Sequence, residues 1–275
     1  PVARLLGKGG DADKEIYAVS RLAAGADESK DASLGLHFDL TVPFARYVLE
    51  NAGRLNFPFR RYQIQKSWRG ERPQEGRFRE FTQADIDVVD VGDLPSHVEA
   101  EMPLVIAEIF EQLPLGEFRV RCNNRKIPQG FYLGIGLTDL VGTLRTVDKL
   151  DKIGPDAVRA QLVAAGASVE QADACLALAQ ICTTDTSFVD QVRALGVSHP
   201  LLEEGLGILA EVMAAAALAT RPGRVVADLA IARGLDYYTG TVYETQIAGF
   251  ESWGSVAGGG RYDALASDGK VTYPG

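Results

Sequence analysis

The stretch "FRRYQIQKSWRG" (residues 59–70), joined through "ERPQE" to "GRFREFTQADIDVVD" (76–90), decides the fold of this chain. In the second run, apolar residues such as Ile86 and Val88 alternate with polar residues such as Asp85 and Asp87. Such alternation is the pattern of a half-buried strand. Because two strand-like runs are joined by this polar, proline-containing connection, we predict a long antiparallel hairpin over residues 59–90.

The sequence next to the hairpin predicts a strand and two helices. "LGLHFDLTVPFARYVLEN" (34–51) begins as a strand and turns at Asp39–Pro43 into a helix, with Phe44, Val48 and Leu49 facing inward. Residues 94–113 have the periodicity of an amphipathic helix, and residues 117–124 read as a further strand.

The residue composition and the hydrophobic spacing change further along the chain. Residues 126–220 are rich in Ala, Leu, Asp and Gln at helical spacing, which predicts helices. Residues 224–248 again have the pattern of strands, and residues 254–265 are predicted to form a glycine-rich turn. We therefore predict an α+β fold, a mostly antiparallel sheet flanked by helices and interrupted by a helical insertion. The two parts of the core domain are expected at residues 1–125 and 221–275, with the insertion at 126–220.

Composition limits the classes of protein to consider. The chain has 275 residues, 46% of them hydrophobic, which is enough for a large core, and it has no apolar run of about eighteen residues that would span a bilayer. Cys122, Cys175 and Cys182 are an odd number without CxxC spacing, which indicates neither a disulfide framework nor a zinc site and favours a reducing, cytoplasmic location. The net charge of −9 argues against a generally basic nucleic-acid-binding surface but leaves room for a local basic site.

The connection of the hairpin concentrates arginine. Residues 69–79 contain Arg69, Arg72, Arg77 and Arg79. One interpretation is a solvated edge hairpin whose charges prevent edge-to-edge pairing. The other is a nucleotide site, because guanidinium groups bind phosphate in a bidentate manner and the nearby Phe81 offers a face to a base.

Three further stretches have both an ordinary and a functional interpretation. Asp39 and Thr41 stand where a strand becomes a helix, so they are either a helix cap or a pair that holds an ammonium group. "AGGGRYD" (257–263) is either a flexible turn or a place where a ligand lies against bare backbone. "RGLDYYTGTVYE" (233–244) places Arg-Gly and Asp-Tyr-Tyr just before a predicted strand. An ordinary edge strand does not need these residues, so the stretch is either such a strand or a site for a polar ligand.

Together these stretches resemble the histidyl-tRNA synthetases, from about Leu34 to Asp263 and in the same order. The arginine hairpin is similar to the second signature motif of class II aminoacyl-tRNA synthetases, which is moderately specific. "RGLDYY" is far more specific to the histidine enzymes. The resemblance implies a class II fold, ATP and histidine as substrates, and Mg²⁺ that accompanies ATP without a metal site built by the protein.

The resemblance also implies roles for individual residues. ATP would be held by Arg69, Glu71, Arg77, Phe81, Arg233, Gly259 and Arg261. Histidine would be held by Asp39, Thr41, Gln83, Asp87, Tyr237 and Tyr238. The acceptor end of tRNA would be contacted by Arg72, Gln74 and Arg79. Arg233 is implied to be the catalytic residue, which reaches the reacting carboxylate and the α-phosphate.

The family also implies a homodimer that acts on tRNA(His) and has no membrane segment. The third class II motif and the anticodon-binding domain have no counterpart in residues 1–275, so we expect the chain to be part of a longer polypeptide. Two alternatives remain. One is the regulatory paralogue that joins the ATP phosphoribosyltransferase of histidine biosynthesis, and the other is a non-catalytic tRNA-sensing domain. Both are expected to have damaged catalytic positions, whereas the arginine hairpin and "RGLDYY" are intact.

Overall fold

The structure is a computed structural model that describes residues 15–21, 34–231 and 237–275. The described residues form two compact units. The first comprises residues 15–21, 34–94, Tyr237 and 262–275, and the second comprises 95–231 and 238–261. Within the described ranges, no helix has both the length and the apolar character needed to cross a membrane.

The first unit is built around the predicted hairpin. Strands β3 (Phe59–Trp68) and β4 (Glu80–Val89) pair antiparallel along their whole length, with Phe59 opposite Val89 and Trp68 opposite Glu80. The connection between them contains a small backbone bridge between Gln74 and Arg77. The prediction of a long antiparallel hairpin is therefore confirmed.

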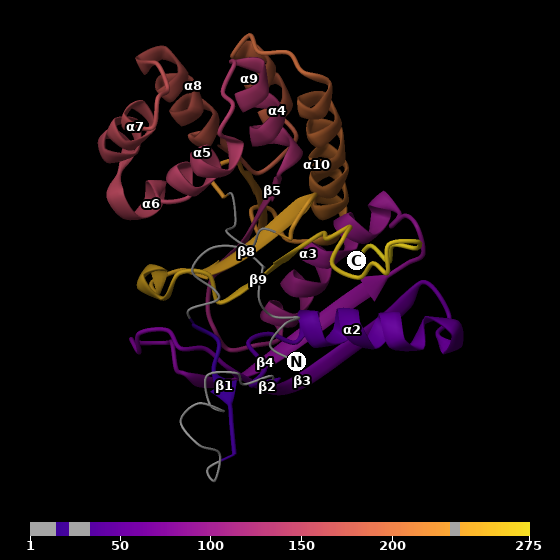
Figure 1. The fold of residues 1–275 in the computed structure, drawn as a ribbon. Helices are drawn as coiled ribbons and strands as arrows, with labels where there is room; N and C mark the ends of the chain where they lie inside the picture. Colours follow the sequence, from indigo (N-terminus) through magenta and orange to yellow (C-terminus); the bar gives the residue numbers. More distant parts are fainter. Residues whose placement is uncertain (1–14, 22–33, 232–236) are drawn as a thin grey trace. The chain divides into compact units, whose positions relative to one another are not determined.

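Helix α2 (Thr41–Asn51) lies along this hairpin, as Figure 1 shows. The Phe44 ring of α2 stacks on the Phe59 ring of β3 with their centroids 6.0 Å apart. These two rings belong to a small apolar cluster whose buried members are Phe44, Ala45, Val48, Val89, Ala266 and Tyr273. The unit also contains the short strands β1 (Ala18–Val19) and β2 (Leu34–Gly35) and the 3₁₀ turn η3 (Ala52–Arg54). The strand and the helix predicted over residues 34–51 are confirmed.

The second unit contains a five-stranded sheet. Its order is β6 (Cys182–Thr183), β7 (Val225–Asp228), β5 (Phe118–Asn124), β8 (Thr241–Ile247) and β9 (Ala257–Gly260). Only the β5–β7 pair is parallel. The predicted α+β class is confirmed, and the parallel pair is an addition that strand texture alone does not indicate.

One prediction in this unit is wrong. Residues 257–260 were expected in a glycine-rich turn, but they form β9 and pair with β8, with Gly260 opposite Val242. Gly260 is needed for a close approach of its neighbours, whereas a side chain at Gly259 would meet nothing within 4 Å. A Cβ on Gly260 would lie 2.8 Å from the carbonyl oxygen of Thr241 and 2.8 Å from the ring of Tyr238. A residue type that is unfavourable in strands is thus required here by the neighbouring backbone.

Helices flank this sheet, one of them before β5 and the others making up most of residues 126–219. They are α3 (Ser96–Glu111), α4 (Lys126–Gly134), α5 (Leu140–Val147), α6 (Leu150–Ile153), α7 (Pro155–Ala164), α8 (Val169–Ala179), α9 (Phe188–Ala194) and α10 (Pro200–Ala219), with the 3₁₀ turn η4 (Glu251–Trp253). In Figure 1, α4 and α10 lie side by side. Their close contact depends on Gly130, because a Cβ there would lie 2.3 Å from the backbone nitrogen of Leu202. The helical texture is confirmed, and the domain boundaries at 125 and 220 stay predictions.

Candidate functional site

One face of the hairpin is mostly buried or half-buried, and this enclosed face is rich in polar side chains. Arg61 stands opposite Asp87, Gln63 opposite Asp85 and Ser67 opposite Phe81, and these side chains are buried or half-buried. The opposite face carries the ion pair of Lys66 with Glu80 and also exposed apolar side chains, such as Tyr62 at 80% and Ile64 at 67%. This is the reverse of the usual arrangement, in which the apolar face of a strand is buried.

The arginines beside the connection are fixed by neighbouring groups. The Nε of Arg69 donates to the carbonyl oxygen of Phe38 at 3.1 Å, and its guanidinium carbon lies 4.7 Å from the Phe38 ring centroid and 5.2 Å from that of Phe81. Glu71 accepts from Nη1 of Arg77 at 3.3 Å, and its nearest approach to Arg69 is 3.9 Å. The structure therefore brings together four residues predicted to bind ATP, namely Arg69, Glu71, Arg77 and Phe81.

Carboxylates gather on the same face of the hairpin. Burial, helped by the repulsion of Asp85 and Asp39, raises the pKa of Asp87 to about 7, although Arg61 and the hydrogen bond from Tyr262 lower it. Burial also raises the pKa of Asp85. A group of carboxylates at which burial opposes ionisation favours a cationic ligand, because a positive charge offsets their repulsion.

Asp39 and Thr41 lie at the start of α2, as predicted. Oδ1 of Asp39 accepts from the backbone N–H of Val42 at 3.0 Å, so the helix-cap interpretation holds for that oxygen. Asp39 is 5% exposed. On β4, the side-chain oxygen of Gln83 accepts from the Ser67 hydroxyl at 3.1 Å. The site predicted for histidine thus has Asp39, Thr41, Gln83 and Asp87 in one unit, together with Tyr237, whose ring meets that of Tyr262 edge-on at 6.5 Å.

The residues predicted to contact the tRNA acceptor end lie in the connection of the hairpin. Arg72, Gln74 and Arg79 are exposed. The backbones of Gln74 and Arg77 exchange hydrogen bonds at 3.3 and 3.0 Å, and Gly76 takes a positive φ of 74° that favours glycine. The connection is therefore an ordered turn with its polar side chains in solvent.

The second unit contains three of the predicted residues. Tyr238 is 8% exposed and lies against Gly260, next to the predicted Gly259. Nη1 of Arg261 is paired with the carboxylate of Glu99 at 2.9 Å. Arg233, the predicted catalytic residue, lies outside the described residues.

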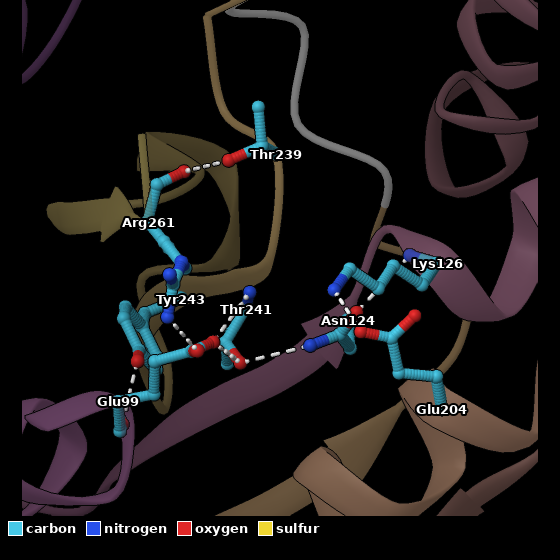
Figure 2. Close-up of polar contacts among 8 residues, drawn as sticks. All are labelled: Glu99, Asn124, Lys126, Glu204, Thr239, Thr241, Tyr243 and Arg261. Carbon is cyan, nitrogen blue, oxygen red and sulfur yellow. Dashed lines mark hydrogen bonds and ion pairs between the residues drawn. The ribbon is translucent and has the colours of Figure 1, made fainter. Parts of the chain in front are cut away.

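Glu99 organises the surroundings of Arg261, as Figure 2 shows. Its carboxylate accepts from the backbone N–H of Thr241 at 3.0 Å and from the hydroxyl of Thr241, while its backbone oxygen accepts from the hydroxyl of Tyr243 at 2.6 Å. Glu99 is only 3% exposed. This buried carboxylate therefore joins α3, β8 and the residue that follows β9.

Three of these groups were missed by the sequence interpretation. Asp85 lies between Gln83 and Asp87, so the alternation of a strand places all three on one face, and this signal was available. The sequence does not mark Arg61 as a site residue, because its proximity to Asp87 follows only from the pairing register of the two strands. Nor does it mark Glu99, because an acid in an amphipathic helix is ordinarily placed on the solvent side. Within the described ranges, no group of three or more His, Cys, Asp or Glu side chains is arranged to hold a metal ion.

Comparison with known proteins shows the family of this chain. A family model described as histidyl-tRNA synthetase matches residues 7–274. The histidine–tRNA ligase of Micrococcus luteus is 62% identical over 286 residues, which cover all of this chain and 62% of that protein. The chain thus spans about three fifths of the length of this relative.

Solved structures give the same picture. The histidyl-tRNA synthetase of Nostoc sp. PCC 7120 superimposes with a TM-score of 0.82 at 34% identity, over 94% of this chain and 58% of that one. A structure from Bacillus halodurans, described as an ATP phosphoribosyltransferase regulatory subunit/histidyl-tRNA synthetase, matches at 18% identity with a TM-score of 0.77 over 95% of this chain and 65% of that one, which supports the fold alone. On the family match over nearly its whole length, this chain belongs to the histidyl-tRNA synthetase family.

Proposed function

We propose that this chain is the catalytic part of a histidine–tRNA ligase. The protein activates histidine with ATP to give histidyl-adenylate and pyrophosphate, and then transfers histidine to the 3′ end of tRNA(His). Family membership supports this activity. The single observation that carries it is the enclosed face of the hairpin, where Asp85 and Asp87 lie on the same strand face as Phe81, which contacts Arg69.

Histidine is recognised by its charge and by its ring. Asp39, Thr41 and Gln83 bind the α-amino group, which suits a carboxylate, a hydroxyl and an amide oxygen. Asp87 and Tyr238 bind the two imidazole nitrogens, and Tyr237 completes the site. An apolar amino acid would leave these buried polar groups without partners, and sites of that kind reject analogues strongly without an editing step.

ATP is held mainly by the arginines. Arg69 binds the α-phosphate and Arg77 the outer phosphates, while Glu71 and Phe81 contact the adenine. The guanidinium of Arg69 is pre-positioned by the Phe38 carbonyl and the two rings, which lowers the entropy lost on binding. Gly259 and Arg261 contribute further ATP contacts from β9 and the residue after it. Mg²⁺ accompanies ATP as its counter-ion.

The chemistry consists of two displacements. A carboxylate oxygen of histidine attacks the α-phosphorus of ATP, and the bond to the pyrophosphate leaving group breaks. Negative charge grows on the phosphate oxygens during this step, and a guanidinium at Arg233 stabilises it without reorganisation. A ribose hydroxyl of the terminal tRNA nucleotide then attacks the acyl carbon, and AMP leaves.

Histidine-dependent exchange between pyrophosphate and ATP tests this function. We expect the full-length protein to catalyse the exchange with histidine and not with leucine or phenylalanine, because only histidine satisfies both ring contacts. Exchange at background level with all amino acids would overturn the proposal and favour the regulatory paralogue, whose phosphoribosyltransferase partner can then be sought directly.

The connection of the hairpin is proposed to contact the acceptor end of tRNA(His). Arg72, Gln74 and Arg79 are exposed on an ordered turn, and such side chains hydrogen-bond to bases and phosphates of unpaired nucleotides. We expect Arg72→Ala combined with Gln74→Ala to leave adenylate formation intact and to slow transfer to tRNA by about tenfold, as for a loss of about 1.4 kcal/mol. Single-turnover measurement of each half-reaction separates the two effects. An equal loss in both would contradict the assignment.

Two further properties belong to the proposal. The family leads us to expect a homodimer. A cytoplasmic location is supported by the state of the cysteines, since Cys122, Cys175 and Cys182 are all free. Mass photometry and the cellular fraction of the tagged protein would test these two points.

A further inference from the structure

Arg61 forms a buried ion pair with one of the residues proposed to read histidine. It lies on β3 directly opposite Asp87 of β4. Its Nη2 is 2.7 Å from Oδ2 of Asp87, and the two side chains are 9% and 8% exposed. A pair so well removed from water interacts far more strongly than an exposed pair of the same geometry.

Arg61 is held in place by three other contacts. Nη1 donates to the side-chain oxygen of Gln63 at 2.8 Å, Nη2 donates to the carbonyl oxygen of Leu40 at 3.1 Å, and the guanidinium carbon lies 4.3 Å from the centroid of the Phe44 ring. Its Nε is buried without a hydrogen-bond partner among the described residues. Burying that donor costs free energy, so an arginine is an unfavourable choice here for stability alone.

The other charges around Asp87 work against its ionisation. Asp85 on β4 and Asp39 before α2 repel a carboxylate at this position, while the hydroxyl of Tyr262 donates to Oδ1 of Asp87 at 3.2 Å. Burial is the largest effect, and it raises the pKa of Asp87 to about 7 even though Arg61 lowers it. Among the described groups that face Asp87, Arg61 is the cation that favours its charged form.

We propose that Arg61 is a positioning residue for histidine selection, which keeps Asp87 as a carboxylate with a fixed orientation so that it accepts the N–H of the imidazole ring. The proposal rests on the proposed function, because it assigns the imidazole to Asp87. A protonated Asp87 presents a hydroxyl donor to the same ring and loses this preference. Arg61 thus acts on selectivity through Asp87, without itself contacting the substrate.

Removing Arg61 should raise the pKa of Asp87. Without the guanidinium, the pKa of Asp87 rises above about 7. The binding-competent carboxylate exists above that pKa, so the pH range of tight histidine binding moves upward. The loss of an adjacent opposite charge shifts a pKa by about one to three units. For a shift of one unit, the carboxylate fraction at pH 7 falls from about one half to about one tenth, which raises the KM for histidine about fivefold.

The test compares three variants of the full-length protein in pyrophosphate exchange, between about pH 6 and about pH 9. Arg61→Met removes the charge and keeps the length, and Arg61→Lys keeps the charge. Arg60→Met is the matched control, because Arg60 is on the same strand and its side chain is exposed. Thermal unfolding monitors the fold of each variant. If Arg61→Met does not fold, Arg61→Gln, which keeps a donor for the Leu40 carbonyl, takes its place.

We expect the Met variant to shift the pH dependence of the KM for histidine upward by about one unit or more, with a much smaller change in the KM for ATP. The Lys and Arg60→Met variants should keep the profile of the unmodified protein. Titration of the substrate imidazole is common to all variants, so it does not contribute to the difference. A stably folded Met variant whose profile is not shifted would overturn the inference, as would equal losses for histidine and ATP. Absence of exchange in the unmodified protein would instead overturn the proposed function.

Discussion

We expect the Arg233→Ala variant to lose about a hundredfold to a thousandfold in the rate of adenylate formation, the range seen when one preorganised donor to a transition-state charge is removed. The affinity for ATP should change much less, because the guanidinium is needed mainly while the pentacoordinate phosphate forms. Single-turnover formation of histidyl-adenylate at saturating ATP and histidine measures this rate directly.

Three comparisons make the Arg233 result specific. Lysine should restore little activity, because a point charge does not bridge two oxygens as a guanidinium does, whereas added guanidinium should recover part of it in the Ala variant. Tyr238→Phe should weaken histidine binding with little effect on the adenylation rate. If Arg233 is an ordinary arginine at a strand edge, its replacement changes stability by a few tenths of a kcal/mol and leaves adenylation unchanged. That outcome would exclude the proposed catalytic role.

The hairpin shows what the sequence could predict. Two long strand-like runs joined by a short polar connection gave the pairing of β3 and β4, and the helix signal after Asp39 gave α2. Both features follow from patterns of neighbouring residues, which can be recognised in a single sequence. The cluster of arginines around the connection followed directly, because strand pairing brings Arg69, Arg77 and Phe81 near one another regardless of the rest of the fold.

Other features depend on long-range register, and periodicity does not contain that information. The sequence predicts a turn over β9 because glycine disfavours strands, and the need for glycine at Gly260 follows only from its closeness to Tyr238 and the Thr241 carbonyl in the folded chain. The enclosed face of the hairpin was not predicted either, because alternation marks two faces without saying which one is covered. The face that carries Arg61, Asp85 and Asp87 proved to be the enclosed one, and the exposed Tyr62 and Ile64 lie on the other.

Glu99 is expected to make a large contribution to stability. Its carboxylate pairs with Arg261, whose side chain is 15% exposed, and accepts from the N–H and hydroxyl of Thr241, which is fully buried. Glu99→Ala deprives all three donors of this partner and should lower the free energy of unfolding by about 3–5 kcal/mol, as for breaking other buried pairs. Urea denaturation measures the loss. Glu108→Ala is the control, because Glu108 is exposed on the same helix, and it should change stability by less than about 0.5 kcal/mol.

A double-mutant cycle shows whether the loss at Glu99 arises from its partner Arg261. Adding Arg261→Ala to Glu99→Ala should cost clearly less than Arg261→Ala alone, because the guanidinium is already without its carboxylate. Additive losses would mean that Glu99 stabilises the fold mainly through Thr241 and the backbone of β8. Glu99→Gln keeps an acceptor for Thr241 and removes the charge, so its effect on the KM for ATP reports the pairing with Arg261 separately from folding. A coupled pair together with a raised KM for ATP in this variant would identify Glu99 as the group that orients Arg261 toward the nucleotide.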